Sequence, residues 1–151
     1  MKIEIDAAAP LEELRALLRE YPDSIPVPLE TDFEQWLAEL PGPYAPPRGA
    51  LLVARANGAN AGCVALRPLD DESAEIKRLY VREAFRGTGV ARALVSELIA
   101  LARGAGYTRL RLDTHSTMTP AQNLYRSFGF AEIPAYWDHP VDGVVFFELS
   151  L

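Results

Sequence analysis

The sequence predicts an α/β fold in which a mixed, mostly antiparallel sheet is flanked by helices. Three observations support this prediction. Three apolar-rich runs lie between Ala50 and Val81, and short turn sequences separate them, as in an antiparallel meander. Residues 90–102 instead repeat apolar side chains at the spacing of a helix. The length of 151 residues, 49% of them hydrophobic, suits one domain over residues 1–151 and is too short for two.

The first half of the chain is expected to contain a strand, two helices and three further strands. Residues 2–5 form the first strand. Residues 10–20 carry four leucines on one stripe of a helix, with Pro10 near its first turn. Residues 30–40 form a second helix, which ends at a proline-rich loop over residues 40–49. The meander then comprises strands at residues 50–55, 62–67 and 74–81.

The second half alternates helices and strands. The helix at residues 90–102 ends at Gly104 and Gly106, and residues 109–114 form a strand. Residues 119–122 have the form of a capping box, with Pro120 at the first helical position, and open a short helix that Gly129 closes. Residues 130–137 and 144–151 are the last two strands. The predicted order is β-α-α-β-β-β-α-β-α-β-β.

Composition and charge exclude several classes of protein. The formal net charge of −6 argues against general nucleic-acid binding, which needs a basic surface. No stretch of 18 apolar residues occurs, so no membrane-spanning segment is expected. The acidic start lacks the apolar run of a signal peptide, and a single cysteine, Cys63, allows no internal disulfide, so a cytoplasmic location is expected. The two histidines and Cys63 lie in unrelated segments and predict no metal site.

The acidic side chains are concentrated near the start of the chain. The first 47 residues contain ten acidic and three basic side chains, whereas the remainder is almost neutral. These acids either attract a cationic substrate or belong to solvated helix faces, and the sequence does not decide between the two.

Residues 79–91 predict a site for a phosphate group. A strand ends here, a glycine-bearing loop follows, and a helix begins at once. Gly87 and Gly89 have no side chain, so the loop can turn tightly and its backbone can approach a ligand. The first turn of a helix offers N–H groups without internal partners and a partial positive charge, which favour pyrophosphate. The lysine of a P-loop is missing, and Arg92 stands where a Rossmann fingerprint has its third glycine.

Two motifs resemble those of the GNAT superfamily of acyl-CoA-dependent N-acyltransferases. The family places Gln/Arg-x-x-Gly-x-Gly/Ala at the start of the helix after its fourth strand, and Arg86-Gly87-Thr88-Gly89-Val90-Ala91 satisfies this pattern. The family's late helix carries Asn and Tyr and ends in Gly-Phe, as residues 123–130 do. The match runs from about Leu51 to the C-terminus, and the whole chain is similar to a group of small bacterial members of the family. It implies the GNAT fold and acetyl-CoA as co-substrate.

The resemblance also implies roles for the matching residues. Backbone groups of Leu79 and Val81, with Tyr80 between them, would bind the pantetheine arm where the fourth and fifth strands separate. Asn123 would bind the same arm or fix the late helix. Tyr125 would direct its hydroxyl at the thioester sulfur and protonate the departing CoA, unless it only packs on the helix face. The pyrophosphate would be held by the amides of Arg86, Gly87, Thr88, Gly89, Val90 and Ala91.

The general base that deprotonates the amine has several candidates. Some family members carry a catalytic glutamate where this chain has Glu75, and strand alternation places Glu75 on the same face as Leu79 and Val81. In the alternative interpretation, Glu75 forms a salt bridge at the strand end. Asp113, His115 and a water molecule are the other candidates.

The predicted function is transfer of an acetyl group from acetyl-CoA to a primary amine of a small-molecule or peptidic acceptor, by direct attack in a ternary complex. The alternative is a non-catalytic CoA-binding sensor or protein-interaction module, which would not need an acid at the sulfur. An acyl-cysteine route through Cys63 has no supporting motif. Tyr136 and Trp137 either line the acceptor pocket or pack in the core. The resemblance allows a homodimer and leaves the acceptor open.

Overall fold

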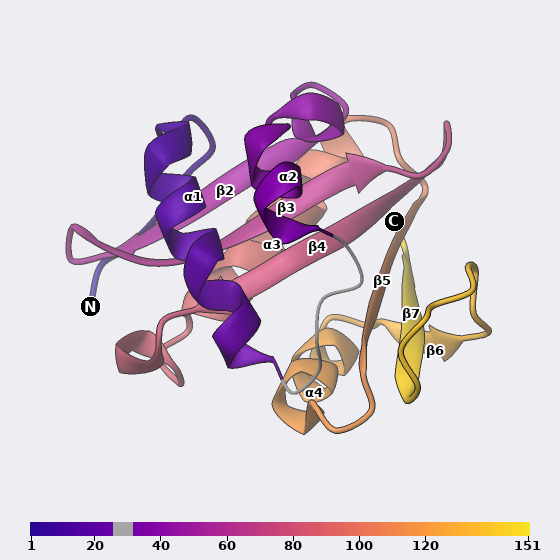
Figure 1. Cartoon of the computed structure of the whole chain (residues 1–151). Coiled ribbons are helices and arrows are strands. Elements are labelled where there is room, and N and C mark those ends of the chain that lie inside the picture. The colour runs from indigo at the N-terminus through magenta and orange to yellow at the C-terminus, as the bar shows by residue number, and fades with distance from the viewer. Residues whose placement is uncertain (26–31) are drawn as a thin grey trace.

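The described part of the chain forms a sheet with helices on both faces (Figure 1). The computed structural model describes residues 1–25 and 32–151. The helices are α1 (Leu11–Glu20), α2 (Phe33–Ala38), α3 (Val90–Gly104) and α4 (Thr119–Ser127). The strands are β1 (Ile3–Asp6), β2 (Ala50–Ala56), β3 (Ala59–Pro68), β4 (Ser73–Val81), β5 (Arg109–His115), β6 (Ala131–Ile133) and β7 (Val144–Ser150). The predicted order of elements is confirmed.

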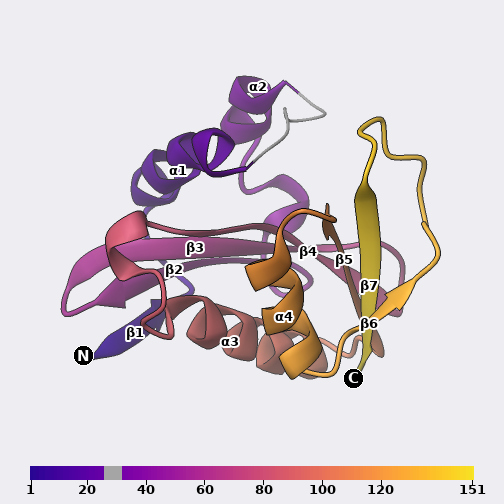
Figure 2. The same ribbon diagram turned by 90° about the horizontal axis from the view of Figure 1, so that it is seen from below.

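The seven strands of the described residues lie in the order β1-β2-β3-β4-β5-β7-β6. Each neighbouring pair is antiparallel except β4 and β5, which are parallel. Helices α1 and α2 cover one face of the sheet and α3 covers the other, as Figure 2 shows. Helix α4 packs into the same apolar cluster as α3. The predicted mixed, mostly antiparallel sheet flanked by helices is therefore confirmed.

Apolar stripes hold the helices on the sheet. Leu14, Leu17 and Leu18 of α1 are buried against one face, and Leu94 and Leu98 of α3 are buried against the other. Burying one leucine side chain contributes about 1.5–3 kcal/mol, so each stripe is enough to fix its helix. Within residues 1–25 and 32–151, no helix has the length and apolarity needed to cross a membrane.

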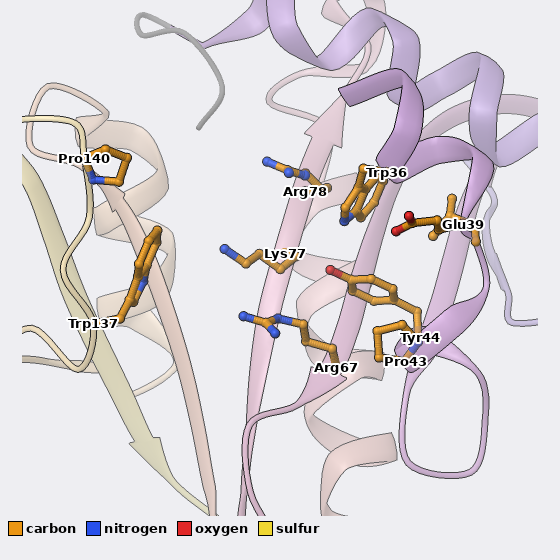
Figure 3. Close-up of a pocket in the computed structure, with 10 residues that line it drawn as sticks. Trp36, Glu39, Pro43, Tyr44, Arg67, Lys77, Arg78, Trp137 and Pro140 are labelled. Atoms are coloured by element: carbon orange, nitrogen blue, oxygen red, sulfur yellow. The ribbon is translucent and has the colours of Figure 1, made fainter. Parts of the chain in front are cut away.

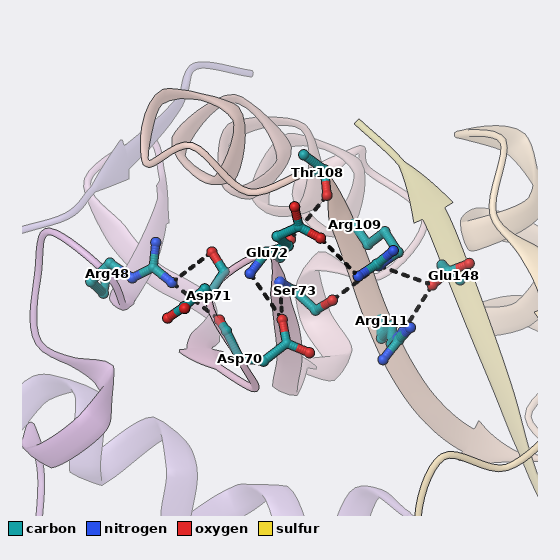
Figure 4. A network of polar contacts seen from close by, with 9 residues as sticks. All are labelled: Arg48, Asp70, Asp71, Glu72, Ser73, Thr108, Arg109, Arg111 and Glu148. Atoms are coloured by element: carbon teal, nitrogen blue, oxygen red, sulfur yellow. Dashed lines mark hydrogen bonds and ion pairs between the residues drawn. The ribbon is translucent and has the colours of Figure 1, made fainter.

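Strands β4 and β5 are paired at one end only. Their ladder joins residues 73–75 to residues 109–111. Two further bonds clamp this end (Figure 4): the Arg109 N–H donates to the Glu72 carbonyl at 3.1 Å, and the Arg109 Nε donates to the Ser73 hydroxyl at 3.1 Å. Beyond residue 75 the two strands separate. The rest of β4 therefore presents a main-chain edge that β5 does not cover.

A β-bulge at Arg78 interrupts the pairing of β4 with β3. Ala65 pairs with Lys77, but Cys63 pairs with Tyr80, so β4 has one more residue than β3 over this interval. Arg78 takes the extra position with a φ of +58°, in the left-handed region. This conformation costs a residue other than glycine about 1–2 kcal/mol. The surrounding sheet therefore holds Arg78 in place.

The bulge changes which face of the sheet the following residues occupy. Ala74 and Ile76 belong to the cluster beneath α3, so Glu75 between them faces the α1 and α2 side. Leu79 and Val81 also pack against the α3 cluster. The prediction that Glu75 shares a face with Leu79 and Val81 is therefore wrong, because simple alternation fails across an inserted residue.

Helix α2 is shorter than the predicted helix at residues 30–40. The Asp32 side chain accepts a hydrogen bond from the Gln35 N–H at 3.2 Å and caps the helix, which begins at Phe33. Glu39 follows its last residue as the C-cap. Positions 30 and 31 of the prediction lie outside the described residues.

The capping box predicted at residues 119–122 is wrong. The N-cap of α4 is Met118, so Thr119 is already helical, Pro120 is second rather than first, and no side chain caps this end. Gln122 donates from Nε2 to the carbonyls of His115 and Ser116, at 3.1 and 3.0 Å. Its amide thus supports the preceding loop and not the helix cap.

The strand predicted at residues 130–137 is present only as the three residues of β6. Pro134 follows directly and has no N–H to donate to a ladder, which ends the pairing with β7. The last strand is confirmed as β7. The residues between β6 and β7 therefore form a long connection, which contacts β5 through the hydrogen bond from Trp137 to Asp113.

Candidate functional site

A cleft lies where β4 and β5 separate. Its cavity measures about 100 Å³ and is bounded by β4, β5 and α4. Leu79, Asp113, His115 and Tyr125 are among the residues that line it. These four come from three separate elements, and each is a candidate site residue from the sequence. The separation of the two strands is what brings them to one opening.

The main chain of β4 directs polar groups toward this cleft. The Arg82 N–H donates to the Ala61 carbonyl of β3 at 2.8 Å. Because alternate residues of a strand direct their main-chain groups to the same neighbour, those of Leu79 and Val81 point to the opposite edge, away from β3. The Val81 carbonyl accepts a hydrogen bond from Arg86 Nε at 3.0 Å. The main-chain donors and acceptors on this edge of β4 are therefore not paired with β5.

The loop before α3 turns on two glycines. Gly87 and Gly89 have φ values of +74° and +95°, which a residue with a side chain adopts only with strain. Gly89 is the N-cap of α3, and the first intrahelical bond runs from the Ala93 N–H to the Gly89 carbonyl at 3.0 Å. The preceding amides have no partner within the helix. Val90 is buried and Ala91 half-buried, so they anchor this turn.

Side chains of the loop turn away from these amides. The Thr88 hydroxyl donates to the Phe85 carbonyl, and Arg86 Nε donates to the Val81 carbonyl. The exposed residues of the loop are Arg86, Gly87, Thr88 and Gly89. Backbone amides that open onto solvent at a helix N-terminus are the donor set that pyrophosphate requires. The local structure therefore fits a diphosphate group.

Tyr125 of α4 lines the cleft with only 6% of its surface exposed. Its ring packs on Phe130, with the centroids 5.6 Å apart, so the residue also belongs to the core. Desolvation raises the pKa of Tyr125 above its ordinary value. The hydroxyl consequently keeps its proton at neutral pH and can donate to an anionic leaving group.

Glu75 is completely buried, and both of its carboxylate oxygens have partners. Arg67 Nε donates to Oε1 at 2.9 Å, and Lys77 Nζ lies 3.5 Å from the same oxygen. The Tyr136 hydroxyl donates to Oε2. The salt bridge of the alternative interpretation is thus present. An amine can reach this carboxylate directly only if one of these partners moves.

Asp113 is among the residues that line the cleft, and Glu75 is not. Its Oδ2 accepts a hydrogen bond from Trp137 Nε1 at 3.0 Å and lies 3.8 Å from Lys77 Nζ. A carboxylate beside Tyr125 in the same cavity is placed to accept a proton.

His115 lines the cleft with both ring nitrogens engaged. Nε2 lies 3.0 Å from the Asp142 carbonyl, which can only accept, so Nε2 carries the proton. Nδ1 then accepts from the Thr117 N–H at 3.3 Å. The lone pair that a general base needs is therefore already occupied by the adjoining turn.

Three other residues named from the sequence lie apart from the cleft lining. The Tyr80 side chain packs under α1, where its hydroxyl donates to Glu20 at 2.8 Å, and desolvation raises its pKa to about 12. Asn123 is exposed, and within the described residues its side chain forms no hydrogen bond that would fix α4. Cys63 is fully buried, and desolvation raises the pKa of its thiol to about 12. An acyl-cysteine route therefore gains no support.

A second, larger cavity adjoins the cleft and measures about 430 Å³ (Figure 3). Its walls come from α2, the loop after α2, strands β3 and β4, and the connection after β6. Trp137 faces the side chains of Arg67, Lys77 and Arg78 across the opening. Trp137, which from the sequence could line a pocket or pack in the core, lines this cavity. The basic residues and Trp36 were not predicted as site residues. No local pattern marks them, because they meet only in the folded chain.

The acidic residues of the first 47 positions that the structure describes do not gather around either cavity. Arg55 forms ion pairs of 2.7 Å with both Asp6 and Glu13, and Arg82 forms one of 2.7 Å with Glu20. Of the acidic side chains in this region that the structure describes, only Glu39 lines one of these two cavities. The described acidic side chains near the start of the chain are therefore mostly paired with basic side chains or exposed to solvent.

Comparisons with known proteins agree with this architecture. An uncharacterized N-acetyltransferase of Schizosaccharomyces pombe is 38% identical over 146 residues, covering 93% of this chain and 88% of that protein. N-acetylaspartate synthetase of Danio rerio is 32% identical over 110 residues, which are 72% of this chain. The match spans only 39% of the length of that zebrafish protein.

Solved structures share the fold at lower identity. A GNAT-family acetyltransferase of Staphylococcus aureus superposes with a TM-score of 0.82 at 19% identity, over 99% of both chains. A putative acetyltransferase of Salmonella typhimurium, solved with its cofactor acetyl-CoA, gives 0.76 at 22% identity over 99% of this chain and 94% of that one. The family model described as Acetyltransferase (GNAT) family matches residues 11–130. This chain belongs to the acetyltransferase (GNAT) family.

Proposed function

We propose that the protein transfers an acetyl group from acetyl-CoA to a primary amine of a small acceptor, by direct attack of the amine on the thioester. The observation that carries the proposal is the one-ended pairing of β4 with β5. It leaves an open main-chain edge that runs from the cleft holding Tyr125 toward the glycine loop before α3. A long, thin cofactor with an anionic end and a reactive end suits this layout.

The co-substrate would be held chiefly by backbone groups. The amides of residues 87–91 would bind the diphosphate, since the loop side chains leave the helix N-terminus open. The Arg86 N–H, which the sequence also suggested, already donates to the Glu83 carbonyl at 3.2 Å. The free edge at Leu79 and Val81 would bind the pantetheine arm as an added strand, and the exposed Asn123 would contact the same arm. Hydrogen bonds to a charged group contribute about 1.5–3 kcal/mol each, so several amides suffice to anchor the ligand.

The chemistry requires a neutral amine and a protonated leaving group. An amine with an ordinary pKa of about 10.4 is neutral in only about 4 of 10,000 molecules at pH 7, so a proton acceptor is needed. As the new N–C bond forms, the C–S bond breaks and the amine gives up a proton. Tyr125 would give its hydroxyl proton to the sulfur. The Leu79 N–H would polarise the thioester carbonyl.

For the proton acceptor, the geometry favours Asp113 over the other candidates. Asp113 lines the cleft together with Tyr125, whereas the oxygens of Glu75 are covered by Arg67 and Tyr136. Glu75 remains a candidate base if the proton travels through Tyr136. A water molecule between the amine and Asp113 would serve the same purpose.

The acceptor class draws support from one relative. The zebrafish protein is named for N-acetylaspartate, an acetylated small molecule, and matches this chain over 110 residues. The size of the larger cavity, about 430 Å³, is also typical of a small-molecule site. A small amine is therefore preferred to a protein substrate.

The test is a thiol-release assay with acetyl-CoA and a panel of amines. Release of CoA that depends on the added amine, with the acetylated amine identified by mass spectrometry, is the expected result. Tight binding of CoA without release by any amine would contradict the proposal and favour a non-catalytic CoA sensor. A variant carrying Tyr125→Phe should bind acetyl-CoA and turn over slowly.

A further inference from the structure

We propose that the acceptor is a free α-amino acid with a large apolar side chain, and that its carboxylate binds the guanidinium group of Arg78. This inference rests on the proposed acetyl transfer. It names the substrate class for the larger cavity, which the fold and the family leave open.

The first observation is the environment of Arg78. The residue is only 8% exposed, and its Nε is buried with no hydrogen-bond partner in the described structure. Its guanidinium carbon lies over the Trp36 ring at 4.9 Å and over the rings of Tyr21 and Phe33 at 5.6 Å. Stacking on aromatic faces orients the cation but satisfies none of its N–H donors. Because a buried charge without a counter-charge is costly, this guanidinium group would be stabilised by a bound anion.

The second observation is the pairing of the neighbouring cations. Arg67 Nη2 lies 2.8 Å from Glu75, and Lys77 lies 3.8 Å from Asp113. Across residues 1–25 and 32–151, no carboxylate forms an ion pair with Arg78. Of the three basic side chains that point into the cavity in Figure 3, Arg78 is therefore the one whose charge this part of the protein leaves uncompensated.

The third observation is the location of Arg78 between the two cavities. Only Lys77 and Arg78 line both the 430 Å³ cavity and the 100 Å³ cleft, among the residues described. A carboxylate bound at Arg78 thus lies at their junction. An amino group one carbon away can enter the cleft toward Tyr125, while the substituent on that carbon enters the larger cavity. An α-amino acid suits this arrangement, because its carboxylate, amino group and side chain are attached to one carbon.

The walls of the larger cavity define the substituent. They consist mostly of apolar and aromatic side chains: Trp36, Leu40, Pro43, Tyr44, Trp137 and Pro140. Glu39, the one acidic residue among the described lining, is exposed and accepts a hydrogen bond from Gln35 at 3.1 Å. A hydrophobic or aromatic side chain is therefore favoured over a charged one.

The experiment compares three matched amines on the intact protein: L-phenylalanine, L-phenylalaninamide and 2-phenylethylamine. The kcat/KM for the free acid should exceed that for each of the other two by a factor on the order of tenfold to a hundredfold. Equal rates for all three, with clear amine-dependent release of CoA, would overturn this inference and leave the proposed function standing. Release with no amine at all would overturn both.

Variants at Arg78 attribute the preference to one side chain. Asparagine tolerates the left-handed backbone of the bulge, so Arg78→Asn removes the cation with little strain. In this variant the preference for the free acid should disappear, and in Arg78→Lys it should be partly retained. Arg103→Gln, on an exposed residue in the last turn of α3, is the matched control and should keep the preference. A preference that survives Arg78→Asn would overturn the assignment.

A binding measurement makes the test independent of turnover. The chain has two tryptophans, Trp36 and Trp137, and both line the larger cavity. Titration with L-leucine should change their fluorescence to saturation, and L-leucinamide should require a concentration at least about tenfold higher. The same response to both ligands would contradict the role of Arg78.

Discussion

The Tyr136 hydroxyl donates a hydrogen bond to Oε2 of Glu75, which lies 61 positions earlier in the chain. Since Arg67 and Lys77 approach the other oxygen, both oxygens of this buried carboxylate are occupied. The Tyr136 ring also packs edge-on against Phe146, with the centroids 5.1 Å apart. The bond thereby attaches the segment after β6 to strand β4 beside the larger cavity.

Tyr136→Phe should lower the free energy of unfolding by about 1–3 kcal/mol, because it leaves one oxygen of a buried carboxylate without a donor. Urea denaturation at neutral pH measures the change. A double-mutant cycle with Glu75→Gln should show a coupling energy of similar size. Additive effects of the two substitutions would mean that the bond contributes nothing to stability.

The stability of the protein should fall as the pH rises above about 10. Desolvation raises the pKa of Tyr80 to about 12, and it also raises the pKa values of Tyr125 and Tyr136. In the unfolded chain these phenols ionise near their ordinary pKa, so above it the unfolded state binds fewer protons than the folded state. The contribution is complete below about pH 10 and is lost as the pH approaches the folded values. Urea titrations from about pH 8 to about pH 11 test this, and a constant free energy over that range would refute it.

Gly89→Glu should weaken CoA binding by more than about tenfold, because it places a carboxylate beside the diphosphate and a side chain at a φ of +95°. The matched control is Gly58→Glu in the β2–β3 turn, where the φ is +84° and an added Cβ would have open space. At Gly89 an added Cβ would likewise meet only Ile3 Cδ1, at 3.9 Å. The control should lose comparable stability and retain its affinity for CoA in calorimetric titration. Equal affinity in both variants would argue against the diphosphate site.

Tyr125→Phe should lower kcat by about 100-fold and leave the KM for acetyl-CoA nearly unchanged, because the ring still packs on Phe130 and only the proton donor is lost. Tyr107→Phe is the control: Tyr107 is also buried, but its hydroxyl donates to the Arg48 carbonyl and it lines neither cavity. Steady-state kinetics of both variants give the comparison. A parallel loss of kcat and of acetyl-CoA affinity in Tyr125→Phe would point to a packing role.

Asp113→Asn should lower kcat by about 100-fold, because asparagine keeps an acceptor oxygen for Trp137 but cannot take a proton at neutral pH. Asp71→Asn, on an exposed residue of the β3–β4 turn, should be neutral. If Glu75→Gln, corrected for folded fraction, abolishes turnover while Asp113→Asn does not, the base is Glu75.

The elements that the sequence predicts well are those with a strong local signal. The leucine stripe of α1, the helical period of α3 and the glycine turn before α3 depend on residues within one or two turns of each other. The motif residues 86–91 and Tyr125 could be placed for the same reason. Local spacing dictates local geometry, and the family resemblance supplied their roles.

The bulge at Arg78 could not be predicted, because it depends on the match between β4 and β3 and not on β4 alone. It reverses the face assigned to Glu75 relative to Leu79. The larger cavity could not be predicted either, since Trp36 and Trp137 come to line one cavity only after the sheet has formed. The capping box was predicted wrongly although its residues are adjacent in the chain. The Gln122 side chain donates to two carbonyls of the preceding loop, and the sequence pattern does not reveal these acceptors.

The backbone and the side chain of Arg78 have different roles at the β-bulge. The inserted residue determines the course of the β4 backbone, while its guanidinium group protrudes among aromatic rings on the other side. If Arg78 binds the acceptor as proposed, a substitution at position 78 would change which amines are accepted and would leave the groups proposed to bind acetyl-CoA unchanged. Under that proposal, single substitutions would be enough to alter specificity, and position 78 would be the first one to diversify in the laboratory.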